Sequence, residues 1–444
     1  MKFSIAELGR LLSDYPGIKH YRVAYSGGLD STVLLTAMAR LRDTGANWSL
    51  SAVHVHHGLQ PEADAWPGHC TRLCSELDTP LEMLAVDASP GQGESPEAAA
   101  RNARYQALAT LMNEGEALLT GHHLDDQAET LLLQLMRGSG LPGLAAMPAE
   151  SPFSSGLLIR PLLGFSRDEL KQYAVDEKLE WVEDSSNEDV RFDRNFIRQR
   201  ILPELRSRWP SVVQTVSRSA GHMAEAASLL DELAESDLQC ILDRQGCFID
   251  INGLRRLSEA RQRNLMRHWL RITGLSVPSQ KQLHHILHDV LNSRPDATPC
   301  VRWSGVEIRR YRDRLYAIPS PLQHHASSQI PWDLSGPLSI RGVGFIRPSL
   351  VEGQGLPVSL QGMPGLEIRF RQGGESIQPV RRKHKHDLKK LFQEAGIPCW
   401  VRDRTPMLYQ YEKVVAVAGL CVCEPFQVGK GEQGLMLEWE QAFN

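Results

Sequence analysis

The chain has 444 residues, of which 42% are hydrophobic and 23% are charged. At roughly 100 to 200 residues per domain this length predicts two to four domains, and the near-average composition excludes a disordered, collagen-like or low-complexity chain. The formal net charge of −4 comes from 49 basic and 53 acidic residues, so the total neither requires nor excludes a polyanionic partner.

The sequence has no recognisable targeting or membrane segment. Residues 1–10 lack the unbroken apolar core of a signal peptide, and no stretch reaches the roughly 20 apolar residues that a membrane span needs. The eight cysteines are scattered without a CxxC spacing, which disfavours a zinc ribbon or a thioredoxin-like redox pair. We therefore expect a cytoplasmic protein with reduced thiols and no membrane partner.

The first half of the chain alternates between strand and helix patterns. The predicted strands are 21–25, 50–55 and 117–120, and the predicted helices are 32–40, 97–113 and 124–136. Strands separated by helices favour parallel pairing with right-handed crossovers. The pattern therefore predicts an α/β domain with a doubly wound parallel sheet.

After this half the pattern changes. Residues 167–178 and the arginine-rich stretch 191–208 predict helices, and apolar residues at helical spacing then continue a mostly helical region to about residue 315. Beyond a Pro- and Gly-rich connection, short alternating runs at 366–370 and 414–417 predict a smaller strand-rich α+β domain. These patterns predict three domains. They are a catalytic domain over 1–215, a helical domain that recognises substrate over 216–318, and a C-terminal domain over 319–444.

A glycine-containing loop, Ser26-Gly-Gly-Leu-Asp-Ser31, links the first predicted strand to its helix. Backbone N–H groups at a helix N-terminus suit phosphate, glycine permits close approach, and Asp30 can hold Mg²⁺ that bridges phosphate oxygens. A tight turn with a helix cap would explain a bare Gly-Gly pair. The strand–turn–helix setting and the whole string favour a phosphate site, although the Walker motif is absent.

A helix and a second polar loop follow. The helix places Arg101 and Arg104 near Tyr105, where the arginines could neutralise phosphate or lie on a solvated surface. The loop Gly-His-His-Leu-Asp-Asp-Gln-Ala-Glu-Thr, residues 121–130, groups three carboxylates that suit a cationic substrate or a metal. Helix N-termini favour acids in any case, and zinc is a further alternative for paired histidines, but the spacing is not HExxH.

The loop at 26–31 resembles the PP-loop of the N-type ATP pyrophosphatases, which cleave ATP between its α- and β-phosphates. More specific motifs lie at 53–59 (VHVHHGL), 97–105 (EAAARNARY), 121–130, 137–144, 160–163 and 194–203, and in the last third at 368–375, 388–398 and 400–404. This ordered set resembles the long form of the tRNA(Ile)-lysidine synthetase family. His56 and Gln60 depart from the family pattern, HVNHGLR, so they receive no role.

The resemblance implies a ligase that joins L-lysine to C2 of the wobble cytidine in tRNA(Ile) with a CAU anticodon. ATP adenylates the C2 carbonyl oxygen with release of pyrophosphate, and the ε-amine of lysine then displaces AMP to form lysidine. The product reads AUA instead of AUG and accepts isoleucine instead of methionine. The implied cofactors are ATP and Mg²⁺, and no DNA partner is implied.

The resemblance also assigns candidate residues. The ATP site comprises Ser26, Gly27, Gly28, Leu29, Asp30, Ser31 and His54, with Mg²⁺ at Asp30. The catalytic candidates are Asp30, Arg101, Arg104, His122 and Asp126. The lysine ammonium is assigned to Asp126 and Glu129, and His122 or Asp126 is the candidate base that takes a proton from the amine.

Two basic runs, in 191–208 and 381–390, are candidates for RNA contact. Basic runs are usually solvated surface, but these are interleaved with aromatic residues, which suits phosphate contact together with base stacking. The tRNA-binding candidates are Arg194, Arg198, Arg381, Arg382, Lys383, Lys389 and Lys390.

Three other functions were weighed. A PP-loop tRNA 2-thiolation enzyme is the closest alternative, but such enzymes tend to need reactive cysteines or a cluster held by CxxC. An amidotransferase would need a glutaminase nucleophile, and Lys2 stands where an N-terminal cysteine would be. A non-catalytic RNA-binding protein would not need the intact Ser26, Asp30 and Asp126.

Overall fold

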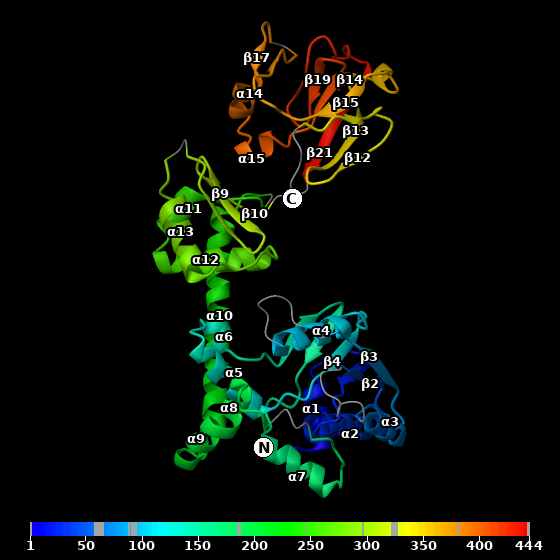
Figure 1. The fold of residues 1–444 in the computed structure, drawn as a ribbon, viewed down its shortest axis with the longest axis vertical. Coiled ribbons are helices and arrows are strands. Elements are labelled where there is room, and N and C mark those ends of the chain that lie inside the picture. Colours follow the sequence, from blue (N-terminus) through cyan, green and yellow to red (C-terminus); the bar gives the residue numbers. More distant parts are fainter. Residues whose placement is uncertain are drawn as a thin grey trace. The chain divides into compact units, whose positions relative to one another are not determined.

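The computed structural model describes residues 2–56, 66–87, 89, 96–183, 188–244, 246–294, 297–320, 327–380 and 382–441 (Figure 1). The chain divides into two compact units, Met1–Leu229 and Leu230–Asn444. Within the described ranges, no helix has both the length and the apolar character that crossing a membrane requires.

The first unit is built on a six-stranded sheet in the order β3-β2-β1-β4-β6-β5. All neighbours pair in parallel except β5, which is antiparallel to β6, so the predicted doubly wound parallel sheet is confirmed. The strands are β1 His20–Ala24, β2 Ser49–His56, β3 Leu81–Ala85, β4 Glu116–Leu119, β5 Glu150–Phe153 and β6 Gly156–Ile159. Its first helices are α1 Ile5–Leu12, α2 Leu29–Asp43, α3 Trp66–Glu76, α4 Pro96–Ala109, α5 Leu124–Met136, α6 Leu141–Leu144 and α7 Arg167–Asp176.

The strand order reverses between β1 and β4, because the chain runs outward from β1 to β3 and then returns to the other side of β1. In open parallel sheets, ligands bind outside the carboxyl ends of the strands at such a switch point. The loop after β1 is 25–28 and the loop after β4 is 120–123. The topology therefore brings the two polar loops of the sequence to one crevice.

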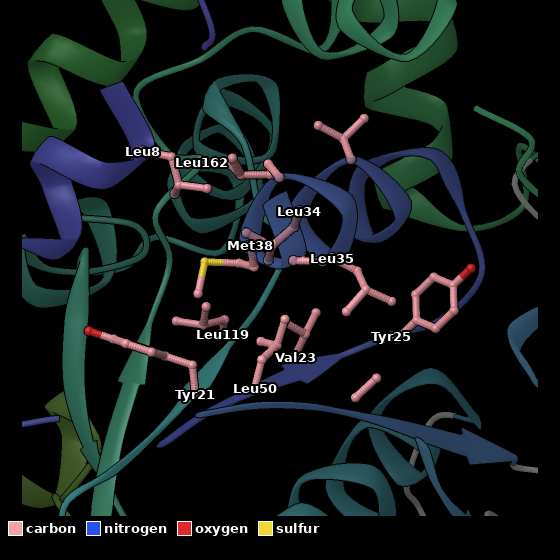
Figure 2. Packing of buried hydrophobic residues seen from close by; sticks show 14 of the residues in the cluster. Leu8, Tyr21, Val23, Tyr25, Leu34, Leu35, Met38, Leu50, Leu119 and Leu162 are labelled. Atoms are coloured by element: carbon pink, nitrogen blue, oxygen red, sulfur yellow. The ribbon is translucent and has the colours of Figure 1, made fainter. Parts of the chain in front are cut away.

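Helix α2 is enclosed on nearly all sides, which fixes the loop at its start. Leu34, Leu35 and Met38 are fully buried and point toward Val23 and Leu119 of the neighbouring strands β1 and β4 (Figure 2). Helices α1 and α7 pack against α2 as well. Shortening one of these buried side chains would lower the free energy of unfolding by about 2 to 5 kcal/mol. This packing holds α2 in place, and with it the first turn of the helix.

The arginine-rich stretch predicted as helical from 191 is interrupted. It consists of α8 Asp193–Phe196, a π-helical turn η3 Ile197–Ile201 and α9 Leu202–Arg208, and it leads into α10 Val212–Ile241. The extra residue of a π turn rotates the side chains that follow it, and such turns occur often at functional sites. A small apolar cluster of Ala128, Ile197, Leu202 and Val213 packs this segment against α5.

In the middle region of the chain, which begins the second unit, helices continue to Val290. They are α11 Ile251–Arg256, α12 Glu259–Ile272, α13 Gln280–His285 and a π turn η4 Ile286–Val290. The prediction of a helical middle region is confirmed to this point, but its extension to about residue 315 was wrong. An antiparallel sheet in the order β7-β10-β9-β8 follows, made of β7 Ile249–Asp250, β8 Cys300–Trp303, β9 Val306–Tyr311 and β10 Arg314–Pro319.

Buried charges explain why these strands were missed. Glu307 is 3% exposed and pairs with Arg302 and Arg309, and Arg310 is 5% exposed and donates to the carbonyls of Leu291 and Ser293. Glu307 and Arg310 are buried on opposite faces of β9, and such buried charges hide the alternation of apolar and polar residues that identifies a strand.

The last third is strand-rich, as predicted, and the predicted runs correspond to β15 and β19. Two sheets have the orders β11-β15-β18-β19-β20 and β12-β13-β21-β14, and β16 pairs with β17. The strands are β11 Ile330–Pro331, β12 Leu338–Ile340, β13 Gly344–Glu352, β14 Leu356–Pro357, β15 Leu366–Arg369, β16 Ser376–Ile377, β17 His386–Asp387, β18 Met407–Gln410, β19 Lys413–Val417, β20 Cys421–Val422 and β21 Gln433–Gln441. A 3₁₀ turn η5 Val358–Leu360 and the helices α14 Leu388–Glu394 and α15 Cys399–Arg402 complete it.

Candidate active site

The two polar loops are in direct contact at the carboxyl ends of β1 and β4. A Cβ atom built on Gly121 would lie 3.1 Å from the carbonyl carbon of Asp30 and 3.1 Å from the backbone nitrogen of Ser31. Only glycine allows the β4–α5 loop to lie this close to the first turn of α2. Gly121 therefore joins two motifs that are about ninety residues apart in the sequence.

The loop before α2 is held by its own serines. The Ser31 hydroxyl donates to the carbonyl of Gly28 at 3.0 Å and accepts from the backbone N–H of Ser26 at 3.2 Å, and the two serine hydroxyls are 3.0 Å apart. Helix α2 starts after Gly28 without a side-chain cap. Its first N–H groups therefore remain available to an anion, as expected for a phosphate-binding helix N-terminus.

A pocket opens beside this loop. It is lined by apolar side chains of β1, β2 and α4, including Val53, Val55 and Leu108, together with His54 and Arg104. The Nδ1 atom of His54 lies 2.9 Å from the carbonyl of Tyr25, and burial lowers the pKa of His54, which keeps the ring neutral. With Nδ1–H donating to that carbonyl, the buried Nε2 is a hydrogen-bond acceptor, and it has no partner.

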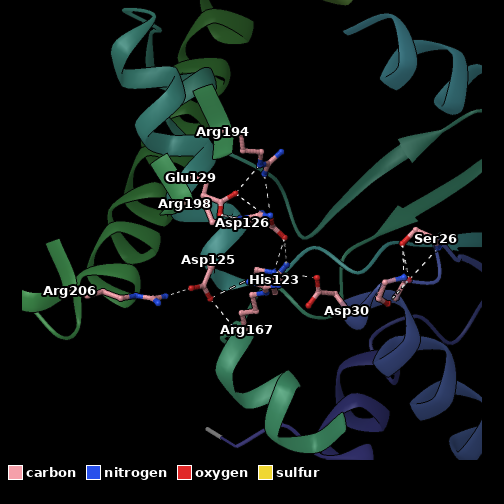
Figure 3. A network of polar contacts seen from close by, with 12 residues as sticks. Ser26, Asp30, His123, Asp125, Asp126, Glu129, Arg167, Arg194, Arg198 and Arg206 are labelled. Carbon is pink, nitrogen blue, oxygen red and sulfur yellow. Dashed lines mark hydrogen bonds and ion pairs between the residues drawn. The ribbon is translucent and has the colours of Figure 1, made fainter. Parts of the chain in front are cut away.

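His123 is the centre of the polar cluster at the loop contact (Figure 3). Its side chain is 1% exposed, and Nε2 lies 3.6 Å from Asp30 Oδ2 and 3.4 Å from Asp126 Oδ2, while Nδ1 lies 3.7 Å from Asp125 Oδ2. Burial alone would lower the pKa of His123, but the carboxylates of Asp126, Asp30 and Asp125 outweigh it and raise the pKa. The His123 ring thus connects Asp30 of the first turn of α2 to Asp126 of α5.

Two arginines from α8 and η3 cover the carboxylates of α5 (Figure 3). Glu129 is 1% exposed and accepts from Arg194 Nε at 2.9 Å and from Arg198 Nε at 2.6 Å. Arg198 also donates to Asp126 Oδ1 at 3.1 Å. The pKa of Asp126 is lowered, because His123 and the arginines outweigh the effect of burial. Sequence reasoning had assigned these carboxylates to lysine and these arginines to tRNA, whereas the structure brings all four residues together.

Asp125 connects the first turn of α5 to neighbouring helices. It accepts from the backbone N–H of Arg167 at the start of α7 at 2.8 Å, and it pairs with Arg206 of α9. These contacts anchor the first turn of α5 to two other helices.

His122 has a different hydrogen-bond partner from His123. Its Nδ1 lies 2.8 Å from the Thr120 hydroxyl. Burial lowers the pKa of His122 to about 4, and the nearby Arg160 and Arg194 act in the same direction, against the carboxylate of Asp126. His122 is therefore neutral at physiological pH.

The arginines of α4 lie near the pocket rather than in the carboxylate cluster. Arg104 lines the pocket, and the Arg101 guanidinium lies 4.9 Å from the centre of the Tyr105 ring. Sequence reasoning gave no role to Arg160, which is 7% exposed and donates to the carbonyl of Pro148 at 2.8 Å. Its buried Nε has no hydrogen-bond partner, and its positive charge helps to lower the pKa of His122.

The missed residues His123, Gly121 and Arg160 all lie inside or next to motifs that were recognised. In the loop His122-His123 the sequence does not show which ring faces the carboxylates. That choice depends on the N-cap position of His123 at the start of α5, where its backbone N–H donates to Asp126 Oδ2 at 3.0 Å.

The basic candidates of the last third lie on the surface of the second unit. Arg382, Lys383, Lys389 and Lys390 are exposed, and Arg382 pairs with Glu394 at 2.7 Å. Arg381 lies outside the described residues, as do residues 57–60 of the motif after β2.

The side chains of the site can supply only some of the ligands that Mg²⁺ needs. Among the described residues, no group of three or more His, Cys, Asp or Glu side chains is arranged to hold a metal ion. However, Asp30 Oδ1 is buried without a hydrogen-bond partner at the start of α2. Mg²⁺ is commonly bound by one or two carboxylates plus substrate phosphates, and this arrangement matches that pattern.

The thiols nearest the loop are not reactive. Cys70 and Cys74 are buried, and burial raises their pKa values to about 12 and about 11. Because the thiolate is the nucleophile, thiols with such pKa values are inert at neutral pH. This argues against sulfur transfer through these residues.

Three family models match the chain. They are a PP-loop domain over residues 4–205, a TilS substrate binding domain over 249–316 and a TilS substrate C-terminal domain over 366–439. Among solved structures, the U34-tRNA thiolase NcsA from Methanococcus maripaludis with its [4Fe-4S] cluster covers 50% of this chain and 78% of its own, at 17% identity and a TM-score of 0.43.

Curated relatives match almost the whole chain. The tRNA(Ile)-lysidine synthase of Coxiella burnetii is 44% identical over 432 residues, which cover 97% of this chain and 95% of the relative. Those of Methylococcus capsulatus and Alkalilimnicola ehrlichii are 45% and 46% identical, covering 91% and 93% of this chain and 92% of each relative.

Proposed function

The chain belongs to the tRNA(Ile)-lysidine synthase family, a family of ATP-using ligases, and we propose that its active site is the crevice between β1 and β4. Its function is lysidine formation on tRNA(Ile). The observation that carries the site assignment is the contact between the loops, where Gly121 lies against Asp30 and His123 links Asp30 to Asp126.

The β1 loop is proposed to bind ATP. The free N–H groups at the start of α2 and the hydroxyls of Ser26 and Ser31 suit the pyrophosphate part of ATP. The adjoining apolar pocket suits the adenine ring, and the acceptor Nε2 of His54 suits the exocyclic amine of adenine. Arg104, at the pocket wall, supplies positive charge toward the phosphates.

Mg²⁺ is proposed to bind at Asp30 together with phosphate oxygens, where it would neutralise charge on the leaving pyrophosphate. Asp30 Oδ1 is the unpartnered oxygen available for it. His123 holds the other oxygen, Oδ2, so the orientation of the Asp30 carboxylate is set from the α5 side.

L-Lysine is proposed to bind at the cluster of Asp126, Glu129, Arg194 and Arg198. Each arginine side chain is still 25% exposed while it covers Glu129, so the pair can also receive the carboxylate of a free amino acid. Asp126 is 8% exposed, and its carboxylate suits an ammonium group, which would replace part of its pairing with His123 and the arginines. Glu129 is enclosed, so we assign its effect on lysine to the placement of the two guanidinium groups.

The attacking ε-amine must lose a proton, and His122 and Asp126 remain the two candidate acceptors. His122 is neutral because burial lowers its pKa to about 4, so it has a free lone pair at every pH near neutrality. Asp126 is ionised but already shared by three cationic groups. A pKa of about 4 also makes His122 a weak proton acceptor, so both groups stay candidates for the base.

The tRNA is proposed to contact the exposed cations Arg382, Lys383, Lys389 and Lys390 of the second unit through its phosphates. Arg381 belongs to the same run. The three predicted domains, 1–215, 216–318 and 319–444, remain our proposal for how catalysis and RNA recognition are divided along the chain.

The test is incubation with ATP, labelled lysine and a tRNA(Ile) transcript with a CAU anticodon. We expect label in the RNA together with release of AMP and pyrophosphate. A transcript with a UAU anticodon is the control and should stay unlabelled. Unlabelled RNA in both reactions, with sulfur incorporated instead when a sulfur donor is supplied, would reverse the choice between ligation and thiolation.

Gly121→Ala should impair catalysis without unfolding the first unit. The added methyl group meets backbone atoms of Asp30 and Ser31, so one of the loops must shift. The contacts of 3.1 to 3.2 Å require a shift of a few tenths of an ångström. Because a displacement of about 1 Å can cost about 100-fold in rate, we expect a loss of about 3- to 10-fold. The measurement is kcat/KM for ATP in lysidine formation. Gly164→Ala is the matched control, because nothing lies within 4 Å of its Cβ position; equal rates for the two variants would contradict the proposed contact.

A further inference from the structure

A cleft in the second unit is lined by aromatic side chains that the lysidine reaction does not use. It lies between the β9–β10 hairpin and the segment around α15, and its walls include Phe248, Trp269, Arg314, Tyr316, Trp400 and Trp439. Its two sides are connected by Arg402, which donates to the Tyr311 hydroxyl at 2.9 Å.

Three of these rings form a continuous row. The ring centres of Phe248 and Tyr316 are 5.4 Å apart, and those of Tyr316 and Trp400 are 5.3 Å apart. All three are only partly buried, and all three line the cleft. The row therefore presents ring surface to the cleft.

The polar groups of the cleft suit an anionic ligand with hydrogen-bond acceptors. The Arg314 guanidinium lies 4.3 Å from the centre of the Phe248 ring. Trp269 is 1% exposed, and its Nε1–H donor has no partner. None of the described residues that line the cleft is acidic. A buried, unpaired donor on a ligand-sized cleft is expected to receive an acceptor when the ligand binds.

Aromatic rings in a row, a guanidinium and a free donor match the chemistry of unpaired nucleotides. Bases stack on aromatic rings regardless of their sequence, and cations contact the phosphates between them. In a tRNA substrate the anticodon must enter the catalytic crevice, and the nucleotides of the other loops are largely held by tertiary pairing. The single-stranded 3′ terminus is the remaining unpaired segment.

We propose that this cleft binds the unpaired 3′-terminal nucleotides of the tRNA by stacking their bases on Phe248, Tyr316 and Trp400. The proposal rests on the proposed function, since it requires tRNA as the substrate. It adds a contact that does not read the anticodon and that would be shared by every tRNA with an intact 3′ end.

The test compares tRNA(Ile) transcripts with and without their last four nucleotides. For the unmodified protein, removal of the tail should lower kcat/KM for tRNA by about 10- to 100-fold, the range expected from losing one stacked base. The double variant Phe248→Leu with Tyr316→Leu keeps apolar bulk but removes two rings. It should lose a similar factor with the full-length transcript and nothing further with the shortened one.

Phe345→Leu is the matched control, because this ring is 56% exposed on β13 of the same unit and lies outside the cleft. It should behave like the unmodified protein. Equal use of both transcripts by the unmodified protein would overturn the inference while leaving lysidine formation intact, whereas no labelling of full-length tRNA would overturn the proposed function itself. Quenching of tryptophan fluorescence by an ACCA tetranucleotide, lost in the double variant, is the second supporting result; no quenching would contradict the site.

Discussion

Asp30→Asn is expected to lower tRNA-dependent ATP–pyrophosphate exchange by about 100- to 1000-fold, the size of effect seen when one electrostatic contact to a developing charge is removed. Asparagine keeps the shape of the side chain but lacks the charge that the proposed Mg²⁺ site needs. Asp30 Oδ1 is buried without a partner, and Oδ2 lies 3.6 Å from His123 Nε2. The variant therefore loses both the metal site and the ionic link to α5.

The control for this variant lies on the same helix. Asp43 ends α2, and its side chain is 62% exposed. Asp43→Asn should exchange pyrophosphate at the normal rate, because surface pairs contribute little. Titration with Mg²⁺ separates a metal defect from a folding defect: Asp30→Asn should need a higher concentration at unchanged thermal stability. Normal exchange by Asp30→Asn at low Mg²⁺ would remove Asp30 from the ATP site.

The parts of this site that could be predicted are those encoded locally. A strand, a glycine loop and a helix follow one another within residues 20–43, so the phosphate site was visible in the sequence, and the same holds for the loop before α5. Parallel pairing then placed both loops at one edge of the sheet. Their contact at Gly121 follows from the strand order, which local patterns do not contain.

The pairing of Arg194 and Arg198 with Glu129 could not be predicted. These residues are more than sixty positions apart, and an arginine-rich stretch usually lies on the surface. What decides the contact is the packing of Ile197 and Leu202 against Ala128, which holds α8 and the π turn that carry the two arginines against α5. The composition of this stretch predicts that Arg194 and Arg198 bind RNA. The packing shows instead that both arginines form ion pairs within the protein.

Asp126→Asn is expected to lower kcat/KM for lysine by at least about 100-fold, while ATP–pyrophosphate exchange falls much less. The carboxylate faces His123, Arg194 and Arg198, and its charge is the one that suits a lysine ammonium. Measuring lysine incorporation and exchange on the same preparation separates the two half-reactions. A parallel loss of both would instead assign Asp126 to the adenylation step.

Asp126→Asn also removes one member of a buried ion-pair network, and breaking such a pair costs about 3 to 5 kcal/mol when the partner is left uncompensated. A loss of activity could then reflect instability alone.

The double variant Asp126→Asn with Arg198→Gln resolves this, because it removes a charge of each sign from the same contact. Thermal unfolding should return toward the value of the unmodified protein, since the double variant restores the charge balance of the network and Arg194 still pairs with Glu129. Lysine incorporation should stay low, because neither the ammonium nor the carboxylate of lysine regains its partner. Recovery of stability and lysine incorporation together would show that Asp126 serves only to neutralise Arg198, and lysine would then have to bind elsewhere.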